Sequence, residues 1–264
     1  MNAEFPKKFI SSTLQARFIA SALFTAVIAG TWDAWWHSAF GRESFYSPPH
    51  ILLYISVLLA IFLGIYGWHQ TKEKMWKRLA TILILIPLSA PFDELWYRVF
   101  GAETLASPLI VWSPPHVILV LSIIASFFLI LPILKKDENK EAQRLFGVLC
   151  FAGIFALLLF LVSPLEPFAP YHLLGFWGAG FSTAIFAGIL LAVKKWIPGT
   201  GTAFLFVGVV CILLSIGPGE KIAPNIVIPP HDHPPDWLEM FSLILPALIV
   251  DLFYAEHVRG LLAD

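Results

Sequence analysis

A carboxylate and two imidazoles stand at short spacing near the start of this sequence. Asp33 and His37 are four residues apart, so on a helix their side chains share one face. His50 follows thirteen residues after His37, where a returning helix would bring it back to the same level. Imidazole suits copper, zinc, iron and nickel, and two histidines with one carboxylate leave coordination positions open. The spacing predicts a metal site, although an Asp–His pair that only anchors the helix at the interface explains it equally well.

An internal repeat supplies a second candidate pair. Residues 32–41 match residues 92–101, and both copies continue to Ser-Pro-Pro-His, ending at His50 and His116. Proline is tolerated in the first turn of a helix, so each histidine is expected at a helix start. Asp93 in the second copy corresponds to Asp33, and we consider a second metal pair of Asp93 and His116. Two alternatives remain: Asp93 pairs with Arg98, or His116 completes the first site.

Weaker copies of the same ending occur later in the chain. His172 follows Ala-Pro-Tyr, and His231 follows Ile-Pro-Pro. His233 lies in the same polar turn as His231. These three histidines are possible further ligands, but a solvated loop explains His231 and His233, and a hydrogen-bonded core position explains His172.

The composition of this chain is typical of an integral membrane protein. Hydrophobic residues make up 58% of it and charged residues 13%, against about 25% charged in a soluble domain. The net charge of −1 provides no basic field for nucleic acid. Because a helix needs about 20 apolar residues to cross a bilayer, we predict an all-α polytopic bundle of about eight spans. The predicted spans are 17–37, 49–69, 79–99, 115–134, 145–163, 171–193, 202–217 and 237–257.

The spans group into helical hairpins within one transmembrane domain, residues 1–264. The clear repeat covers 17–69 and 79–134, and the weaker ones 145–193 and 202–257. Fourteen Lys and Arg residues fall on the side of the termini, whereas three (Arg42, Arg98 and Lys221) fall on the other. By the positive-inside rule the termini are cytoplasmic. The histidine-rich face is then periplasmic or extracellular.

One carboxylate is expected inside the membrane. Asp251 lies within the last predicted span, where a charge is costly unless it is neutralised or paired. It is either part of a proton pathway, or it is simply protonated or bonded to a neighbouring helix.

Residues 33–50 resemble the metal-site segment of the C subunit of copper membrane monooxygenases, the particulate methane and ammonia monooxygenases. That family's pattern is Asp-x3-His-x12-His with an Arg-acidic-Thr/Ser-Phe loop and a Ser/Thr-Pro-x-His ending, and Arg42-Glu43-Ser44-Phe45 matches the loop. The resemblance implies copper ligands at Asp33, His37 and His50. Asp93 to His116 lies where the family has a second Asn-x3-His block, but Tyr97 replaces its histidine. Beyond about residue 135 the likeness fades.

These observations predict an integral membrane metalloprotein. Copper follows from the resemblance, whereas the ligands alone allow zinc or iron, and oxidation of a small apolar substrate is the chemistry that the family implies. The monooxygenases work with two other subunits, so further membrane subunits or a homo-oligomer are expected partners besides the bilayer. The alternatives are a metal-cation transporter or chaperone, and an accessory subunit of a membrane complex.

Overall fold

The computed structural model describes residues 10–40, 46–100, 109–162, 173–216 and 244–253. All regular structure in these residues is helical, which confirms the predicted all-α class. The helices are α1 (Ser12–Phe40), α2 (Pro48–Thr71), α3 (Lys74–Phe100), α4 (Leu109–Trp112), α5 (Pro114–Leu134), α6 (Lys140–Val162), α7 (Leu173–Trp196), α8 (Thr202–Ile216) and a last helix, Ile244–Phe253.

Five of these helices are long and apolar enough to cross a membrane, and they indicate a multi-pass membrane protein. The five are Ser12–Asp33 within α1, then α2, α3, α5 and α6. The described apolar parts of α8 and of the last helix, Thr202–Leu213 and Ile244–Phe253, are shorter. The described part of every predicted span therefore falls on a helix, but the number of crossings stays a prediction.

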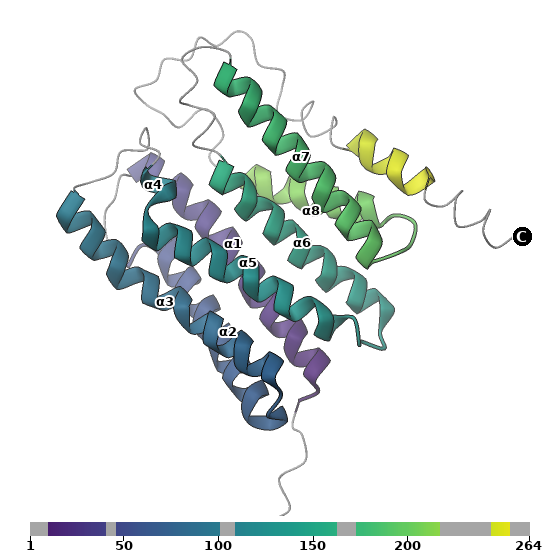
Figure 1. Ribbon diagram of the computed structural model, residues 1–264, viewed down its shortest axis with the longest axis horizontal. Coiled ribbons are helices and arrows are strands. Elements are labelled where there is room, and N and C mark those ends of the chain that lie inside the picture. Colours follow the sequence, from purple (N-terminus) through teal and green to yellow (C-terminus); the bar gives the residue numbers. More distant parts are fainter. Residues whose placement is uncertain (1–9, 41–45, 101–108, 163–172, 217–243, 254–264) are drawn as a thin grey trace, which may run out of the picture.

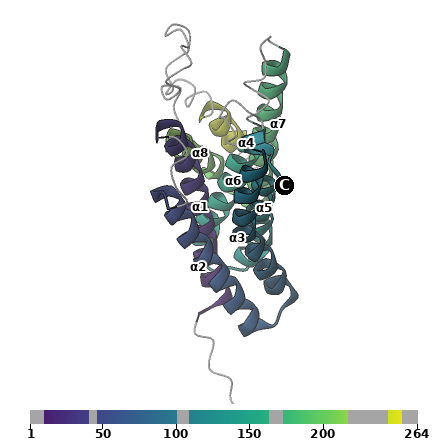
Figure 2. The same ribbon diagram turned by 90° about the vertical axis from the view of Figure 1, so that its left-hand side faces the viewer.

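The first four long helices form two hairpins that pack on each other. α1 packs against α2, α2 against α3, α3 against α5, and α5 back against α1. α6 lies against α1 and α5, and it also contacts α7 and α8. In Figures 1 and 2, α1, α2 and α8 form one layer and α3, α5, α6 and α7 the other. The short helix α4 is joined to the end of α6, because the Trp112 indole donates to the Leu161 carbonyl at 2.8 Å.

Two glycines allow the helices to approach closely. A methyl group on Gly67 of α2 would collide with the ring of Trp76 on α3, and one on Gly153 of α6 would lie 2.7 Å from Phe127 on α5. Trp76 and Phe127 are both buried. Since lipid tails are as apolar as the helices, tight packing of this kind supplies much of the attraction between them.

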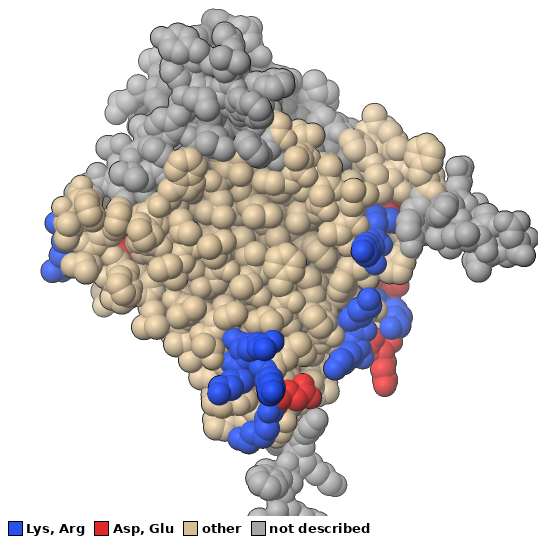
Figure 3. All heavy atoms as spheres, in the orientation of Figure 1, with Lys and Arg blue, Asp and Glu red and all other residues tan. Residues whose placement is uncertain are grey.

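Most of the described basic residues lie at one end of the bundle, in or next to the turns that connect successive helices. These turns join α2 to α3, α5 to α6, and α7 to α8. Figure 3 shows Lys and Arg gathered along this end, which is called the basic end below. Its residues are Arg17, Lys72, Lys74, Lys77, Arg78, Lys135, Lys136, Lys140, Arg144, Lys194 and Lys195.

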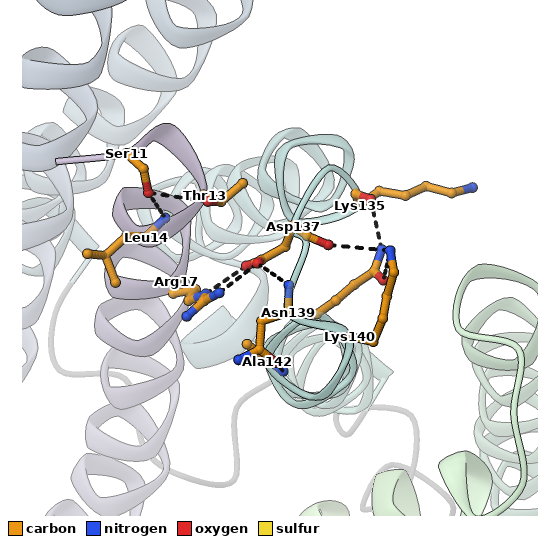
Figure 4. Close-up of polar contacts among 10 residues, drawn as sticks. Ser11, Thr13, Leu14, Arg17, Lys135, Asp137, Asn139, Lys140 and Ala142 are labelled. Atoms are coloured by element: carbon orange, nitrogen blue, oxygen red, sulfur yellow. Dashed lines mark hydrogen bonds and ion pairs between the residues drawn. The ribbon is translucent and has the colours of Figure 1, made fainter. Parts of the chain in front are cut away.

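An ion pair ties α1 to the α5–α6 turn at the basic end (Figure 4). The Arg17 guanidinium donates two hydrogen bonds to the Asp137 carboxylate, each 2.6 Å long. Asp137 is 3% exposed and also accepts from the Asn139 backbone N–H at 3.0 Å. The hydrogen bonds from Arg17 hold the pKa of the Asp137 carboxyl below its ordinary value.

We therefore expect Asp137→Asn to destabilise the protein by about 1–3 kcal/mol, because Arg17 loses a charged acceptor. Since the folded pKa is the lower one, the stabilisation is present at neutral pH. It should be lost as the pH falls below the unfolded value, about 3.9, towards the folded one. Thermal unfolding in detergent as a function of pH measures both effects. Glu138→Gln changes the exposed neighbouring carboxylate and is the control; an equal effect of both changes would contradict this role.

A second ion pair fixes the last helix. Lys194 on α7 and Asp251 lie 2.6 Å apart, with side chains 5% and 9% exposed. Asp251 also accepts from the backbone N–H groups of Ala203 and Phe204, at 3.3 and 2.9 Å. These groups belong to the first turn of α8, where unpaired N–H groups and the helix dipole favour a negative charge. Asp251 is thus bonded to neighbouring helices, which was one of the alternatives predicted from the sequence.

Removing this carboxylate should be costly. Asp251→Ala leaves the Lys194 ammonium buried without its counter-charge, and breaking a buried pair from one side costs about 3–5 kcal/mol. We expect a lowered Tm in detergent and faster hydrogen exchange in Ile244–Phe253. Lys195→Met, which removes the adjacent exposed cation, should leave both unchanged. The assignment fails if Asp251→Ala is as stable as wild type.

Candidate metal centre at the ends of the two hairpins

The Asp33–His50 pair lies at the end of the first hairpin away from the basic end. Asp33 is near the C-terminal end of α1, and His50 is the third residue of α2. His50 Nε2 is 3.2 Å from Asp33 Oδ1, and the two side chains are 21% and 20% exposed. The structure therefore brings together two residues that were predicted from their spacing to share a site.

Local sequence explains where α2 begins. Ser47 precedes the helix with an extended backbone (φ −59°, ψ 150°), and Pro48 and Pro49 fill its first two positions. Proline suits these positions because its missing N–H would have no partner there. The positive end of the α2 dipole then faces the Asp33 carboxylate, which is a favourable arrangement.

The second hairpin repeats this geometry at a longer distance. His116 is the third residue of α5, after Ser113 (φ −58°, ψ 142°) and two prolines. Its Nε2 lies 3.7 Å from Asp93 Oδ1 on α3, which is beyond hydrogen-bond range. The two histidines thus occupy equivalent helix positions, each opposite the carboxylate of its own hairpin.

Ser113 orients His116 through the other ring nitrogen. Ser113 Oγ is 2.8 Å from His116 Nδ1, and Ser113 is fully buried. If a metal ion took Nε2, Nδ1 would carry the proton and donate it to Oγ. A hydrogen bond of this kind fixes the tautomer and orientation of a metal-binding histidine.

A tyrosine packs beside the histidine of the first pair. The Tyr54 ring stacks on His50, with centroids 5.9 Å apart and planes at 16°. The sequence offered a weak signal for Tyr54, because it stands four residues after His50 and so shares its helix face.

The structure gives Arg98 a partner other than Asp93. Arg98 bonds to Glu94 on its own helix, at 2.8 Å, rather than to Asp93. The (i, i+4) spacing makes Glu94 its natural partner. His116 Nε2 lies 3.7 Å from Asp93 Oδ1 across α3 and α5, and the alternative that His116 completes the first site stays a prediction.

His37 stays a prediction as a ligand. It lies on α1 one turn beyond Asp33, and α1 continues unbroken to Phe40, but its side chain is outside what the structure describes. Within the described side chains, no group of three or more His, Cys, Asp and Glu residues is close enough to hold an ion. His172, His231 and His233 lie outside the described residues. Tyr97 is on α3, one turn beyond Asp93.

The fold and this arrangement define a class: a multi-pass helical membrane protein with carboxylate–imidazole pairs at one end of its bundle. Comparison of the chain with protein-family models, curated proteins and solved structures gives no match.

The pairing predicts which side chains can be joined by a covalent link. In a background with Cys150 and Cys211 changed to Ala, Asp33→Cys with His50→Cys should be joined readily by a short bifunctional thiol-reactive linker, which replaces the length of the lost side chains. Asp33→Cys with His116→Cys should react much more slowly, because each histidine faces its own hairpin's carboxylate. Band shifts on non-reducing gels measure both rates. Equal rates would show that the two histidines are not sorted in this way.

Proposed function

We propose that this chain is a membrane metalloprotein that binds a transition-metal ion through Asp33, His37 and His50. The observation that supports it best is the 3.2 Å separation of His50 Nε2 and Asp33 Oδ1. Two ligand atoms at about 2.0–2.2 Å from one tetrahedral ion lie about 3.3–3.5 Å apart. The pair therefore needs little movement to share an ion, and His37 is one helical turn from Asp33.

Copper is the metal that we propose, from the resemblance to the C subunit of copper membrane monooxygenases. The donor set fits it, because imidazole nitrogen and carboxylate oxygen also serve copper, zinc and iron. Copper with open positions would supply redox chemistry on a bound small molecule. The residues of this chain would hold the ion, and the aromatic rings of Trp32 and Trp36, 6.1 Å apart on α1, would give an apolar substrate a surface to bind.

Asp93 and His116 are the proposed second binding pair. Ser113 already holds His116 Nδ1, which leaves Nε2 directed at Asp93. The 3.7 Å separation of the pair is wider than in the first hairpin, and Tyr97 stands where the family has a further histidine. We expect this pair to hold an ion more weakly than Asp33 and His50.

The orientation of the bundle in the membrane is also part of the proposal. The excess of Lys and Arg at the basic end supports a cytoplasmic location for that end. The carboxylate–imidazole pairs would then open to the periplasm or the cell exterior. Other membrane subunits, or further copies of this chain, are the proposed partners, as in the monooxygenase assemblies.

Transport of a metal cation through the bundle is less well supported. A transporter needs polar groups along its path through the membrane. Asp251, the one carboxylate predicted inside the membrane, is bonded to Lys194 and to the first turn of α8. A chaperone or an accessory subunit needs no such path, and in that case the same site would bind metal without turnover.

Metal content tests the proposal. Protein purified in detergent and reconstituted with copper should retain the metal after exhaustive dialysis, as measured by elemental analysis. Asp33→Ala and His50→Ala should each lose most of it, and Asp93→Ala should lose less. His69→Ala is the matched control, because it removes the same side chain from the opposite end of α2. The proposal fails if no transition metal is retained, or if His69→Ala and His50→Ala lose it equally.

A further inference from the structure

A groove of about 250 Å³ opens between α3 and α5 at the basic end. Its lining residues come from the first turns of α3 and the last turns of α5: Lys77, Arg78, Thr81, Ile82 and Leu129. This groove is far from the Asp33–His50 pair, which lies at the other end of α2. It is therefore independent of the proposed metal site.

The lining changes from charged to apolar along the helix. Lys77 and Thr81 are one turn apart on α3, and Arg78 and Ile82 are likewise. Ile82 lies about 7.5 Å further along the helix axis than Lys77, at 1.5 Å per residue. Two cations thus mark the end of the span, while aliphatic side chains mark the part that lies deeper among the apolar turns.

The positive charges of the groove are not neutralised within the described part of the chain. Arg17 and Lys194 each hold a carboxylate, but no described acidic side chain pairs with Lys77 or Arg78. The Lys77 ammonium instead lies over the Trp68 ring of α2, 5.8 Å from its centroid. The Thr81 hydroxyl donates to the Lys77 carbonyl at 3.0 Å, so its oxygen can still accept a hydrogen bond.

The apolar floor continues onto the outer face of α3. Leu85 and Leu88 follow Ile82 on this helix and are 41% and 49% exposed. In a membrane such side chains face acyl chains. A ligand that follows the groove would meet two cations first and then a hydrocarbon surface.

We propose that this groove binds an anionic phospholipid, with its phosphate between Lys77 and Arg78 and one acyl chain along Ile82, Leu85 and Leu129. Basic pockets between membrane helices bind anionic headgroups by the same combination. A free phosphate would use the cations and leave the aliphatic floor unused. An acidic protein segment would have to place polar groups against the aliphatic side chains of the groove, which lie among the apolar turns of α3 and α5.

Native mass spectrometry of the full chain in detergent tests this directly. Phosphatidylglycerol is titrated in, with phosphatidylcholine as the zwitterionic reference. Lys77→Gln with Arg78→Gln should weaken binding of the first phosphatidylglycerol about thirtyfold, at about 1 kcal/mol per basic residue. Lys135→Gln with Lys136→Gln is the matched control, because it removes two exposed cations from the same end outside the groove. Leu129→Trp should weaken binding by filling the floor while keeping both charges.

Each outcome decides the proposal. Loss in the groove variants with retention in the Lys135/Lys136 control supports it. An equal loss in both charge variants would overturn it, since the lipid would then follow the basic end as a whole. Displacement of the lipid by millimolar inorganic phosphate, or no effect of Leu129→Trp, would show a phosphate site without a lipid chain. Preference for an acidic peptide over phosphatidylglycerol in a competition titration would reject the lipid as occupant.

Discussion

The interior of a bilayer offers no water to polar groups, and this constraint governs the whole structure. Backbone N–H and C=O groups must be paired within each segment, so the described chain crosses the apolar region as helices. Polar side chains must then lie at the helix ends or bond to a polar partner. Arg17 pairs with Asp137 and Lys194 with Asp251 at the basic end, and Asp33 pairs with His50 at the other end.

The same constraint explains why the carboxylate–imidazole pairs lie at the end of the bundle opposite the basic end. A carboxylate at the end of one helix and an imidazole at the start of the next meet because the hairpin is antiparallel and the second helix begins at a fixed point. Ser-Pro-Pro sets that point in α2 and again in α5. The residues that start each returning helix thus also place the histidine, and in α2 the Tyr54 ring stacks on it.

Hydropathy was sufficient to predict the apolar segments, and spacing was sufficient to predict the partner of His50. Helix ends were less predictable: α3 begins at Lys74 rather than at 79, because charged residues can continue a helix into the interfacial region. α4 has only four residues, too few to show a helical period. Asp251 and Lys194 are 57 positions apart, so only the packed bundle shows that they pair. The hydrogen bond of Ser113 to His116 likewise depends on side-chain rotamers that no spacing rule contains.

The central claim, that Asp33, His37 and His50 bind one metal ion, is tested most directly by electron paramagnetic resonance of copper-loaded protein whose histidines carry ¹⁵N. The account predicts hyperfine coupling to two imidazole nitrogens in the wild-type protein. It predicts coupling to one nitrogen in His50→Ala, and an unchanged spectrum in His69→Ala. A copper signal without imidazole coupling, or one that His50→Ala leaves unchanged, would contradict it.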